Sequence, residues 1–309
     1  MAILFRSSID SAARWRGELA RRMPERELRI WPEIGDPAAI DYAIVWRPDP
    51  GLLASLPNLK LILSLGAGVD HILSDPLLPR HASIVRLVDP DLTATMSEYV
   101  VLQVLRFHRQ DLAYRAQQQR AEWRELDQMS AAQRRVGVLG FGTLGQDAGR
   151  KLAALGFEVA GWRRGAQDVP GFVTYSGADG LDALVRRSDI LVCLLPLTAQ
   201  TEGILNAALF ARLPRGAALV NAGRGAHLVE GDLIPALDSG QLSAAALDVF
   251  REEPLPPAHP FWTHPRILVT PHVASQTNPA TAADIICDNI RRFEAGEAVP
   301  NRVDPAVGY

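Results

Sequence analysis

Residues 136–145 read VGVLGFGTLG, and this stretch decides the fold. It opens with an apolar, strand-like run and continues through three glycines, Gly140, Gly142 and Gly145, in a G-x-G-x-x-G spacing. The residues that follow, up to Leu155, have the amphipathic spacing of a helix. A strand that passes through such a loop directly into a helix is typical of the first turn of a doubly wound parallel sheet.

Strand-like runs recur along the chain on both sides of this motif. A smaller series of them precedes Arg135 and predicts a second, smaller α/β domain. The runs of this first series are 3–5, 27–30, 42–45, 61–64 and 83–86. From Arg135 onward six runs alternate with helix-compatible segments, which predicts a Rossmann-type doubly wound parallel sheet. These six are 136–139, 157–161, 189–194, 217–221, 244–248 and 267–270.

Two helix-like segments connect the two series. Residues 95–119 contain neither proline nor glycine and predict one long helix, with four apolar residues expected to be buried, Tyr99, Val100, Leu102 and Val104. Residues 278–295 also have a helical pattern and carry no further strand, so we expect them to return to the first domain. A chain of 309 residues exceeds the usual size of one hydrophobic core, which agrees with two domains.

The composition narrows the class of partner. The net charge of -3 gives no electrostatic reason to expect nucleic acid or an acidic membrane surface, so small molecules are the expected partners. No metal site is predicted.

The sequence also predicts the compartment. No run is apolar for long enough to span a bilayer, and the N-terminus lacks a signal-peptide pattern. Cys193 and Cys287 lie in apolar runs and predict reduced, buried thiols. We therefore expect a cytoplasmic protein.

The glycine loop predicts a dinucleotide site. Gly140 permits the tight turn, Gly142 lets the backbone approach a pyrophosphate, and Gly145 lets the helix pack closely on the strand. The first helical residues, Thr143 and Leu144, would direct backbone amides at the anion.

The end of the next strand predicts which dinucleotide binds. An acidic residue there would bind the ribose 2'-hydroxyl of NAD, but this strand ends in Trp162, Arg163 and Arg164. Guanidinium groups bind a 2'-phosphate, so NADP (NADPH) is the predicted cofactor, with NADH as a weaker alternative. Leu195 and Pro196, at the end of a later strand, are expected to line the adenosine side of the site.

Three further strand ends carry polar residues suited to chemistry on a 2-oxo acid. They are the segments 220–225, 247–255 and 269–274, and all should emerge at the same edge of the sheet. Arg224 can bind a carboxylate and polarise a carbonyl, whereas His272 can donate a proton near neutral pH. Glu253 beside the imidazole would orient it and stabilise its protonated form.

At these residues the sequence resembles the D-isomer-specific 2-hydroxyacid dehydrogenases. The resemblance covers essentially the whole chain and rests on VGVLGFGTLG, LVNAGRGAHLVEGDL, AAALDVFREEPLP and VTPHVAS. Within the family the chain is most similar to the glyoxylate/hydroxypyruvate reductase A group, through SLGAGVDHIL, the segment 96–99, the arginine-containing loop and the closing VDPAVGY.

The resemblance implies a different function for each of the two domains. It implies a flavodoxin-like substrate-binding domain at 1–94 and 276–309, an NADP-binding Rossmann domain at 95–275, and a cleft between them. It also implies a homodimer, with residues 95–127 near the interface.

The resemblance also implies roles for single residues. Arg224, Glu253 and His272 take the catalytic positions, Arg224 and His272 also contact the substrate, and Asp248 lies near the nicotinamide. Ala222 and Gly223 are further cofactor contacts. The backbone amides of Ala67 and Gly68 would hold the substrate carboxylate, and a simple turn after the strand at 61–64 is the open alternative. Trp46 would border the substrate pocket, and a buried structural role for it is equally open.

The predicted reaction is reduction of glyoxylate to glycolate and of hydroxypyruvate to D-glycerate. Hydride transfer from NADPH to C2 would accompany proton donation by His272. Reduction of bulkier 2-oxo acids such as phenylpyruvate is an alternative, and so is a dinucleotide-sensing binding protein similar to the C-terminal-binding-protein corepressors. Formate dehydrogenases of the same superfamily have glutamine at the position of Glu253, which disfavours that activity.

Overall fold

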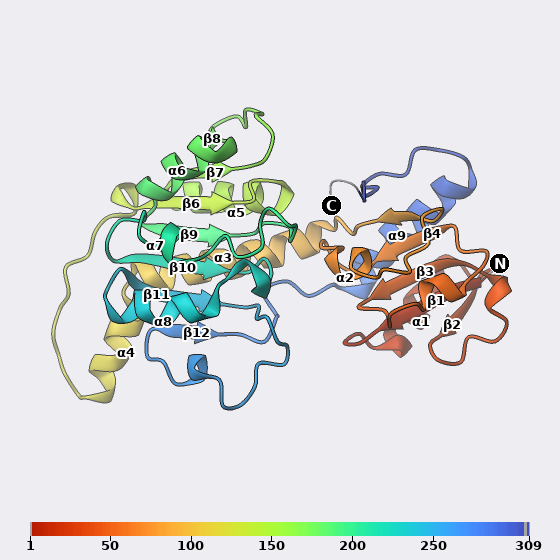
Figure 1. The fold of residues 1–309 in the computed structure, drawn as a ribbon, viewed down its shortest axis with the longest axis horizontal. Coiled ribbons are helices and arrows are strands. Elements are labelled where there is room, and N and C mark those ends of the chain that lie inside the picture. The colour runs from red at the N-terminus through yellow and green to blue at the C-terminus, as the bar shows by residue number, and fades with distance from the viewer. Residues whose placement is uncertain (1, 306–307, 309) are drawn as a thin grey trace. The chain divides into compact units, whose positions relative to one another are not determined.

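A computed structural model describes residues 2–305 and residue 308. Of the closing VDPAVGY motif, Ala306, Val307 and Tyr309 lie outside the described residues. The chain divides into two compact units (Figure 1). The first unit comprises the residues up to Leu92 and those from Thr277 onward, and the second comprises Thr93–Gln276.

The first unit is built on a five-stranded parallel sheet with the order β2-β1-β3-β4-β5. This is the flavodoxin-like strand order, and it confirms the predicted fold class. The strands are β1 (Ala2–Ser7), β2 (Glu27–Ile30), β3 (Ile40–Trp46), β4 (Leu61–Ser64) and β5 (Ser83–Val85). The helical segments are α1 (Ala12–Arg22), η1 (Pro37–Ala39), η2 (Leu53–Ser55), α2 (Asp70–Leu73) and α9 (Pro279–Glu294). β3 and β4 are almost entirely buried, as expected for parallel strands covered on both faces.

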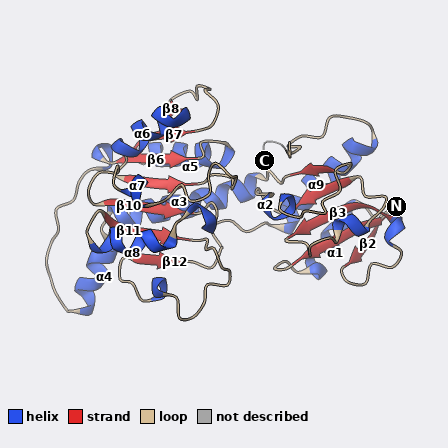
Figure 2. Ribbon diagram, viewed as in Figure 1, coloured by secondary structure: helices blue, strands red, loops and turns tan. Residues whose placement is uncertain are grey.

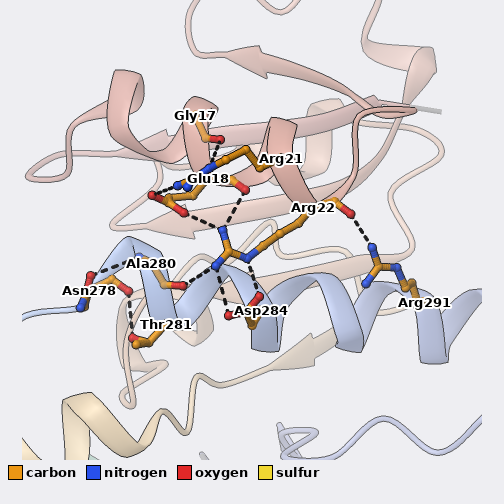
Figure 3. Close-up of polar contacts among 9 residues, drawn as sticks. All are labelled: Gly17, Glu18, Arg21, Arg22, Asn278, Ala280, Thr281, Asp284 and Arg291. Carbon is orange, nitrogen blue, oxygen red and sulfur yellow. Dashed lines mark hydrogen bonds and ion pairs between the residues drawn. The ribbon is translucent and has the colours of Figure 1, made fainter.

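Helix α9 packs on α1 although the whole second unit separates them in sequence (Figure 3). Arg22, the last residue of α1, donates to the carbonyl oxygen of Ala280 at 2.7 Å and to the carboxylate of Asp284 at 3.1 Å. Arg291 donates in return to the carbonyl oxygen of Arg22. These contacts join the C-terminal helix to the N-terminal part of the chain within one unit.

The second unit is built on a seven-stranded parallel sheet with the order β12-β11-β10-β9-β6-β7-β8. Figure 2 shows its strands in red, side by side, with helices beside them in blue. Chain order reverses between β6 and β9, and such a switch point is where open α/β sheets bind ligands. The strands are β6 (Arg135–Leu139), β7 (Glu158–Trp162), β8 (Val173–Tyr175), β9 (Ile190–Cys193), β10 (Ala217–Asn221), β11 (Leu242–Leu247) and β12 (Ile267–Val269). The helical segments are α3 (Pro90–His108), which begins in the first unit, α4 (Asp111–Gln119), η3 (Ala131–Gln133), α5 (Thr143–Ala154), α6 (Gly177–Arg187), α7 (Ala207–Phe210), η4 (Gly225–His227), α8 (Glu230–Asp238) and η5 (Pro260–Trp262).

All six strands predicted for this sheet are confirmed, and the seventh, β8, was missed. β8 has only three residues, and none of them is fully buried, so it carries little of the apolar pattern that reveals a strand. Apolar clusters cover both faces of the sheet, as the doubly wound architecture requires. None of the described helices is long and apolar enough to cross a membrane.

The prediction of one helix over 95–119 was wrong. α3 ends at His108 and α4 begins at Asp111, because Gln110 has a left-handed backbone with φ of 57°. The Gln110 side chain donates to the carbonyl oxygen of Asp127 at 2.7 Å, a contact that local sequence does not reveal. Leu102 was also expected to be buried, but its exposed fraction is 46%, whereas Val100 and Val104 are buried.

Candidate active site

The candidate residues of the second unit leave the sheet at one edge. Since all its strands are parallel, the segments that follow β6, β7, β9, β10, β11 and β12 emerge at the same carboxyl edge. Arg224 follows β10, Glu253 follows β11, and His272 follows β12, three neighbouring strands.

Glu253 and His272 form a hydrogen-bonded pair. Nδ1 of His272 lies 2.9 Å from Oε2 of Glu253, and both side chains are largely buried. The other carboxylate oxygen of Glu253 accepts a hydrogen bond from the amide of Phe250 at 3.1 Å. The pair therefore fixes the ring with Nδ1 toward the carboxylate, and Nε2 faces the opposite side.

The turn that carries His272 is held by a buried carboxylate. Asp248 is 1% exposed, and it accepts hydrogen bonds from the hydroxyl of Thr270 at 2.6 Å and from the amides of Val273 and Ala274, both at 2.9 Å. The phenol of Tyr99, on α3, lies 2.9 Å from the Thr270 hydroxyl and extends this network. These contacts support the left-handed backbone of His272, whose φ is 55°.

The turn that carries Arg224 is held by its neighbours in sequence. Asn221 is fully buried, and its side chain donates to the carbonyl oxygen of Arg224 at 3.1 Å and accepts from the amide of Gly223 at 3.3 Å. The guanidinium of Arg224 donates to the carbonyl oxygen of Gly223 at 2.8 Å. Ala222, a predicted cofactor contact like Gly223, is buried, and its amide donates to the carbonyl oxygen of Cys193 at 3.2 Å.

Gly225 brings this turn against the loop that contains Glu253. A Cβ atom at Gly225 would lie 1.9 Å from the carbonyl carbon of Phe250, so only glycine permits the two backbones to approach this closely. Arg224 and Glu253 were predicted from the sequence, whereas Asn221 and Gly225, which hold the two segments in place, were not. The quoted motif contains both, but their contacts depend on a packing partner that is remote in sequence.

The glycine loop has the geometry that its spacing predicts. Gly140 has φ of 93°, and a Cβ atom there would lie 2.6 Å from the carbonyl oxygen of Leu194. A Cβ atom at Gly145 would lie 2.3 Å from the carbonyl oxygen of Gly140, whereas one at Gly142 would meet no atom within 4 Å. The loop therefore packs tightly on the protein side and is open at Gly142. Thr143 and Leu144 follow in the first turn of α5, where backbone amides have no partner within the helix.

The segment predicted to select NADP over NAD, residues 162–164, lies at the end of β7. The indole of Trp162 donates to the carbonyl oxygen of Gly177 at 2.9 Å, and the amide of Arg163 donates to the carbonyl oxygen of Tyr175 at 3.0 Å. Arg163 is half-buried and Arg164 is exposed. These contacts hold the backbone of the segment at the end of β7.

The segment after β9 lies between the glycine loop and the Arg224 turn. The amide of Leu194 donates to the carbonyl oxygen of Leu139 at 2.8 Å, and Leu195 is buried. The carbonyl oxygen of Pro196 accepts a hydrogen bond from the hydroxyl of Thr201 at 2.8 Å. The structure therefore places Leu195 and Pro196 at the edge where a ligand is expected.

The predicted substrate residues of the first unit lie together at the ends of β3 and β4. The loop 65–69 is closed by Ser64, whose hydroxyl donates to the carbonyl oxygen of Gly68 at 3.1 Å. The ring of Trp46 lies directly on this loop, because a Cβ atom at Gly66 would lie 2.5 Å from it. Ala67, Gly68 and Trp46 are half-buried, so they have both a packing role and an accessible surface.

The strand order and the glycine loop define a Rossmann-type dinucleotide-binding fold. The family model for the NAD binding domain of the D-isomer specific 2-hydroxyacid dehydrogenases matches residues 101–274. The chain belongs to the D-isomer specific 2-hydroxyacid dehydrogenase family.

Full-length relatives and solved structures agree with this assignment. The chain is 44% identical over 314 residues to the glyoxylate/hydroxypyruvate reductase A of Serratia proteamaculans, with 100% of both chains covered. It is 44% identical to the NADPH-dependent glyoxylate/hydroxypyruvate reductase of Sinorhizobium meliloti in complex with NADP and sulfate, with a TM-score of 0.94 and 100% of both chains covered. The D-isomer specific 2-hydroxyacid dehydrogenase of Xanthobacter autotrophicus Py2, in complex with NADPH and MES, is 42% identical with a TM-score of 0.95, and 100% of this chain and 99% of that chain are covered.

Proposed function

We propose that this protein is an NADP-dependent D-2-hydroxyacid dehydrogenase that reduces glyoxylate to glycolate and hydroxypyruvate to D-glycerate. The observation that carries the proposal is the Glu253–His272 pair, 2.9 Å apart, beside the strand end that bears Arg224. The names of its full-length relatives, glyoxylate/hydroxypyruvate reductase A, support the two substrates.

The glycine loop fits a bound dinucleotide. The open space at Gly142 and the amides at the start of α5 suit a pyrophosphate, and Arg163 and Arg164 suit a 2'-phosphate. The NADPH and NADP in the related structures from Xanthobacter autotrophicus and Sinorhizobium meliloti support the same cofactor here, with NADH as a weaker substitute. Bound NADPH supplies the hydride that reduces C2 of the substrate.

The protein's own residues bind the acid and supply the proton. Arg224 binds the substrate carboxylate and polarises the C2 carbonyl through its fixed pair of N–H donors. His272 donates the proton from Nε2 to the developing alkoxide, while Glu253 stabilises the imidazolium and keeps Nδ1 turned away from the substrate. One 2-oxo acid and one proton, with the hydride, then give one 2-hydroxy acid. That Ala67 and Gly68 bind the carboxylate and Trp46 borders the pocket stays a prediction, as does contact of Asp248 with the nicotinamide.

The quaternary state and the compartment are part of the proposal. Large apolar side chains are exposed around α4 and the segment after it, with Trp123 98% exposed and Tyr114 39% exposed. Burial of such side chains against a second copy of the chain favours the homodimer with residues 95–127 at its interface. Cys193 and Cys287 are free and buried, which suits the reducing cytoplasm.

The test is the initial rate of NADPH and NADH oxidation with glyoxylate, hydroxypyruvate, pyruvate and phenylpyruvate. We expect NADPH with glyoxylate and hydroxypyruvate to give the highest kcat/KM. A preference for phenylpyruvate would assign the bulkier substrate class. Tight NADPH binding without turnover of any acid would favour the dinucleotide-sensing alternative.

Two variants test the assigned residues. Arg224→Ala should lose nearly all turnover, whereas Arg186→Ala, which removes an exposed arginine of α6, should not. Unchanged kcat/KM in Arg224→Ala would remove Arg224 from the site.

Replacing Arg163 and Arg164 together by alanine should raise the KM for NADPH about tenfold or more and leave the KM for NADH nearly unchanged, because charge-assisted hydrogen bonds to the 2'-phosphate are lost.

A further inference from the structure

His227 is a buried histidine that the proposed reaction does not use. It is the last residue of the short helix η4, three positions after Arg224, and its exposed fraction is 0%. A polar ring is not buried without hydrogen-bond partners, because the loss of its hydration must be offset. Its partners connect two segments of the candidate site.

The partners of the ring determine which nitrogen carries the proton. Nδ1 lies 3.0 Å from the backbone nitrogen of Arg224, and Nε2 lies 3.3 Å from the carbonyl oxygen of Pro196. An amide only donates and a carbonyl only accepts, so Nδ1 is the acceptor and Nε2 carries hydrogen. The ring of His227 is therefore neutral, in a single tautomer.

Cys193 lies next to the same ring without forming a reactive pair with it. Its Sγ atom is 3.7 Å from Nδ1 of His227, the side chain is fully buried, and burial raises the pKa of the thiol to about 12. The sulfur is thus a protonated thiol rather than a thiolate nucleophile. It packs against the edge of the imidazole and helps to fill the space around it.

Two buried side chains together hold both backbone polar groups of Arg224. Asn221 donates to its carbonyl oxygen at 3.1 Å, and His227 accepts from its amide at 3.0 Å. The absence of a side chain at Gly223 lets the ring of His227 lie this close to the Arg224 backbone, since a Cβ atom at Gly223 would lie 2.9 Å from Nδ1 of His227. The backbone from which the guanidinium projects is therefore fixed on both sides.

We propose that His227 is a positioning residue for Arg224: its Nδ1 holds the Arg224 amide and so sets the direction of the guanidinium toward the substrate carboxylate. This proposal rests on the function proposed for Arg224. The effect should appear in the KM for the 2-oxo acid, because a misdirected guanidinium weakens carboxylate binding before it affects the proton donor.

Three variants distinguish the hydrogen bond of the ring to Arg224 from its hydrogen bond to Pro196. His227→Asn places an amide oxygen near the position of Nδ1 and keeps the acceptor for the Arg224 amide. His227→Gln reaches toward the position of Nε2 and keeps the contact with Pro196, and His227→Leu keeps neither. Leu209→Val is a control for lost packing, since Leu209 is buried in one of the second unit's apolar clusters and its amide donates to the side chain of Asn206 at 3.0 Å.

We expect the Gln and Leu variants to raise the KM for glyoxylate about tenfold, the size expected when a buried hydrogen bond that orients a binding group is broken. The Asn variant should stay within about threefold of the wild type, and the dissociation constant for NADPH, measured by fluorescence, should change less than about threefold in all. Equal KM values for glyoxylate in the Asn and Leu variants would overturn the proposal. So would a KM for glyoxylate that is the same as in the wild type in all three variants.

A second measurement does not depend on turnover. Hydrogen exchange followed by mass spectrometry should show faster exchange of the peptide spanning residues 222–225 in the Gln and Leu variants than in the Asn variant and the Leu209→Val control. Nitrogen NMR of the wild type should show a neutral His227 with hydrogen on Nε2. If the wild type reduces no 2-oxo acid, the proposed function fails, while exchange and NMR still decide whether His227 holds the Arg224 backbone. Equal exchange in all variants would refute that role.

Discussion

The carboxylate of Glu253 joins His272 to the backbone of its own loop. One oxygen lies 2.9 Å from Nδ1 of His272, and the other accepts a hydrogen bond from the amide of Phe250 at 3.1 Å. Both partners present N–H groups when the imidazole is protonated, so each requires an oxygen. A carboxylate supplies two oxygens, whereas a carboxamide supplies one.

Glu253→Gln should therefore lose the orientation of the ring. The side-chain NH2 group of the glutamine must face either the imidazole of His272 or the amide of Phe250, both of which are donors. The imidazolium also loses the neighbouring negative charge. We expect kcat for reduction to fall about 100-fold, at the lower end of what positioned acid catalysis contributes, with NADPH binding unchanged. The matched control is Glu252→Gln, since Glu252 is exposed and precedes Glu253 directly. A larger loss of kcat in Glu252→Gln would mean that the wrong carboxylate was assigned.

Asp248→Asn should disturb the turn that carries His272. The Asp248 carboxylate accepts from Thr270, Val273 and Ala274, and an asparagine would direct its amide hydrogens at one or more of these donors. We expect a loss of about 1–3 kcal/mol in the free energy of unfolding, together with a lower kcat, because the left-handed His272 loses its support. Urea denaturation and steady-state kinetics measure the two effects. Thr270→Val removes a single donor and should have the smaller effect on both, and the reverse order would contradict the network.

Gly225→Ala should push the Arg224 turn away from the Glu253 loop. The added methyl group would lie 1.9 Å from the carbonyl carbon of Phe250, so a backbone segment must move. We expect a loss of about 1–3 kcal/mol in the free energy of unfolding, as for other overpacked positions, and at least a tenfold loss of kcat/KM. Gly231→Ala on α8 is the control, because a Cβ atom there meets nothing within 4 Å. It should be neutral or slightly stabilising, and wild-type activity in Gly225→Ala would refute the close approach.

The ion pair between Arg135 and Asp189 should make stability depend on pH. Burial acts to raise the pKa of Asp189, but hydrogen bonds from the side chain and backbone of Arg135 outweigh it and lower that pKa below its ordinary 3.8. A lowered folded-state pKa contributes stability above the ordinary value, and this contribution is lost as the pH falls from about 4 downward. Asp189→Asn should lower the free energy of unfolding by about 1–2 kcal/mol at pH 7 and by less near pH 3. A difference that is constant from pH 7 to pH 3 would exclude the charge as its source.

The fold followed from local patterns. The glycine spacing at 140–145 and the repeated apolar runs predicted both parallel sheets, because each pattern reflects a constraint within a few residues. The strand β8 and the break at Gln110 did not follow, since the first is too short to show a pattern and the second depends on a contact with the distant Asp127.

The sequence likewise predicted only part of the candidate site. Arg224, Glu253 and His272 could be selected from the sequence because each follows an apolar strand and has a side chain suited to the chemistry. Their mutual distance and the residues that hold them, Asn221, His227 and the Tyr99–Thr270–Asp248 network, were decided by the tertiary structure. The physical reason is that residue type determines what a group can donate, accept or protonate, whereas orientation comes from buried contacts between strand ends, loops and a helix that are remote in sequence.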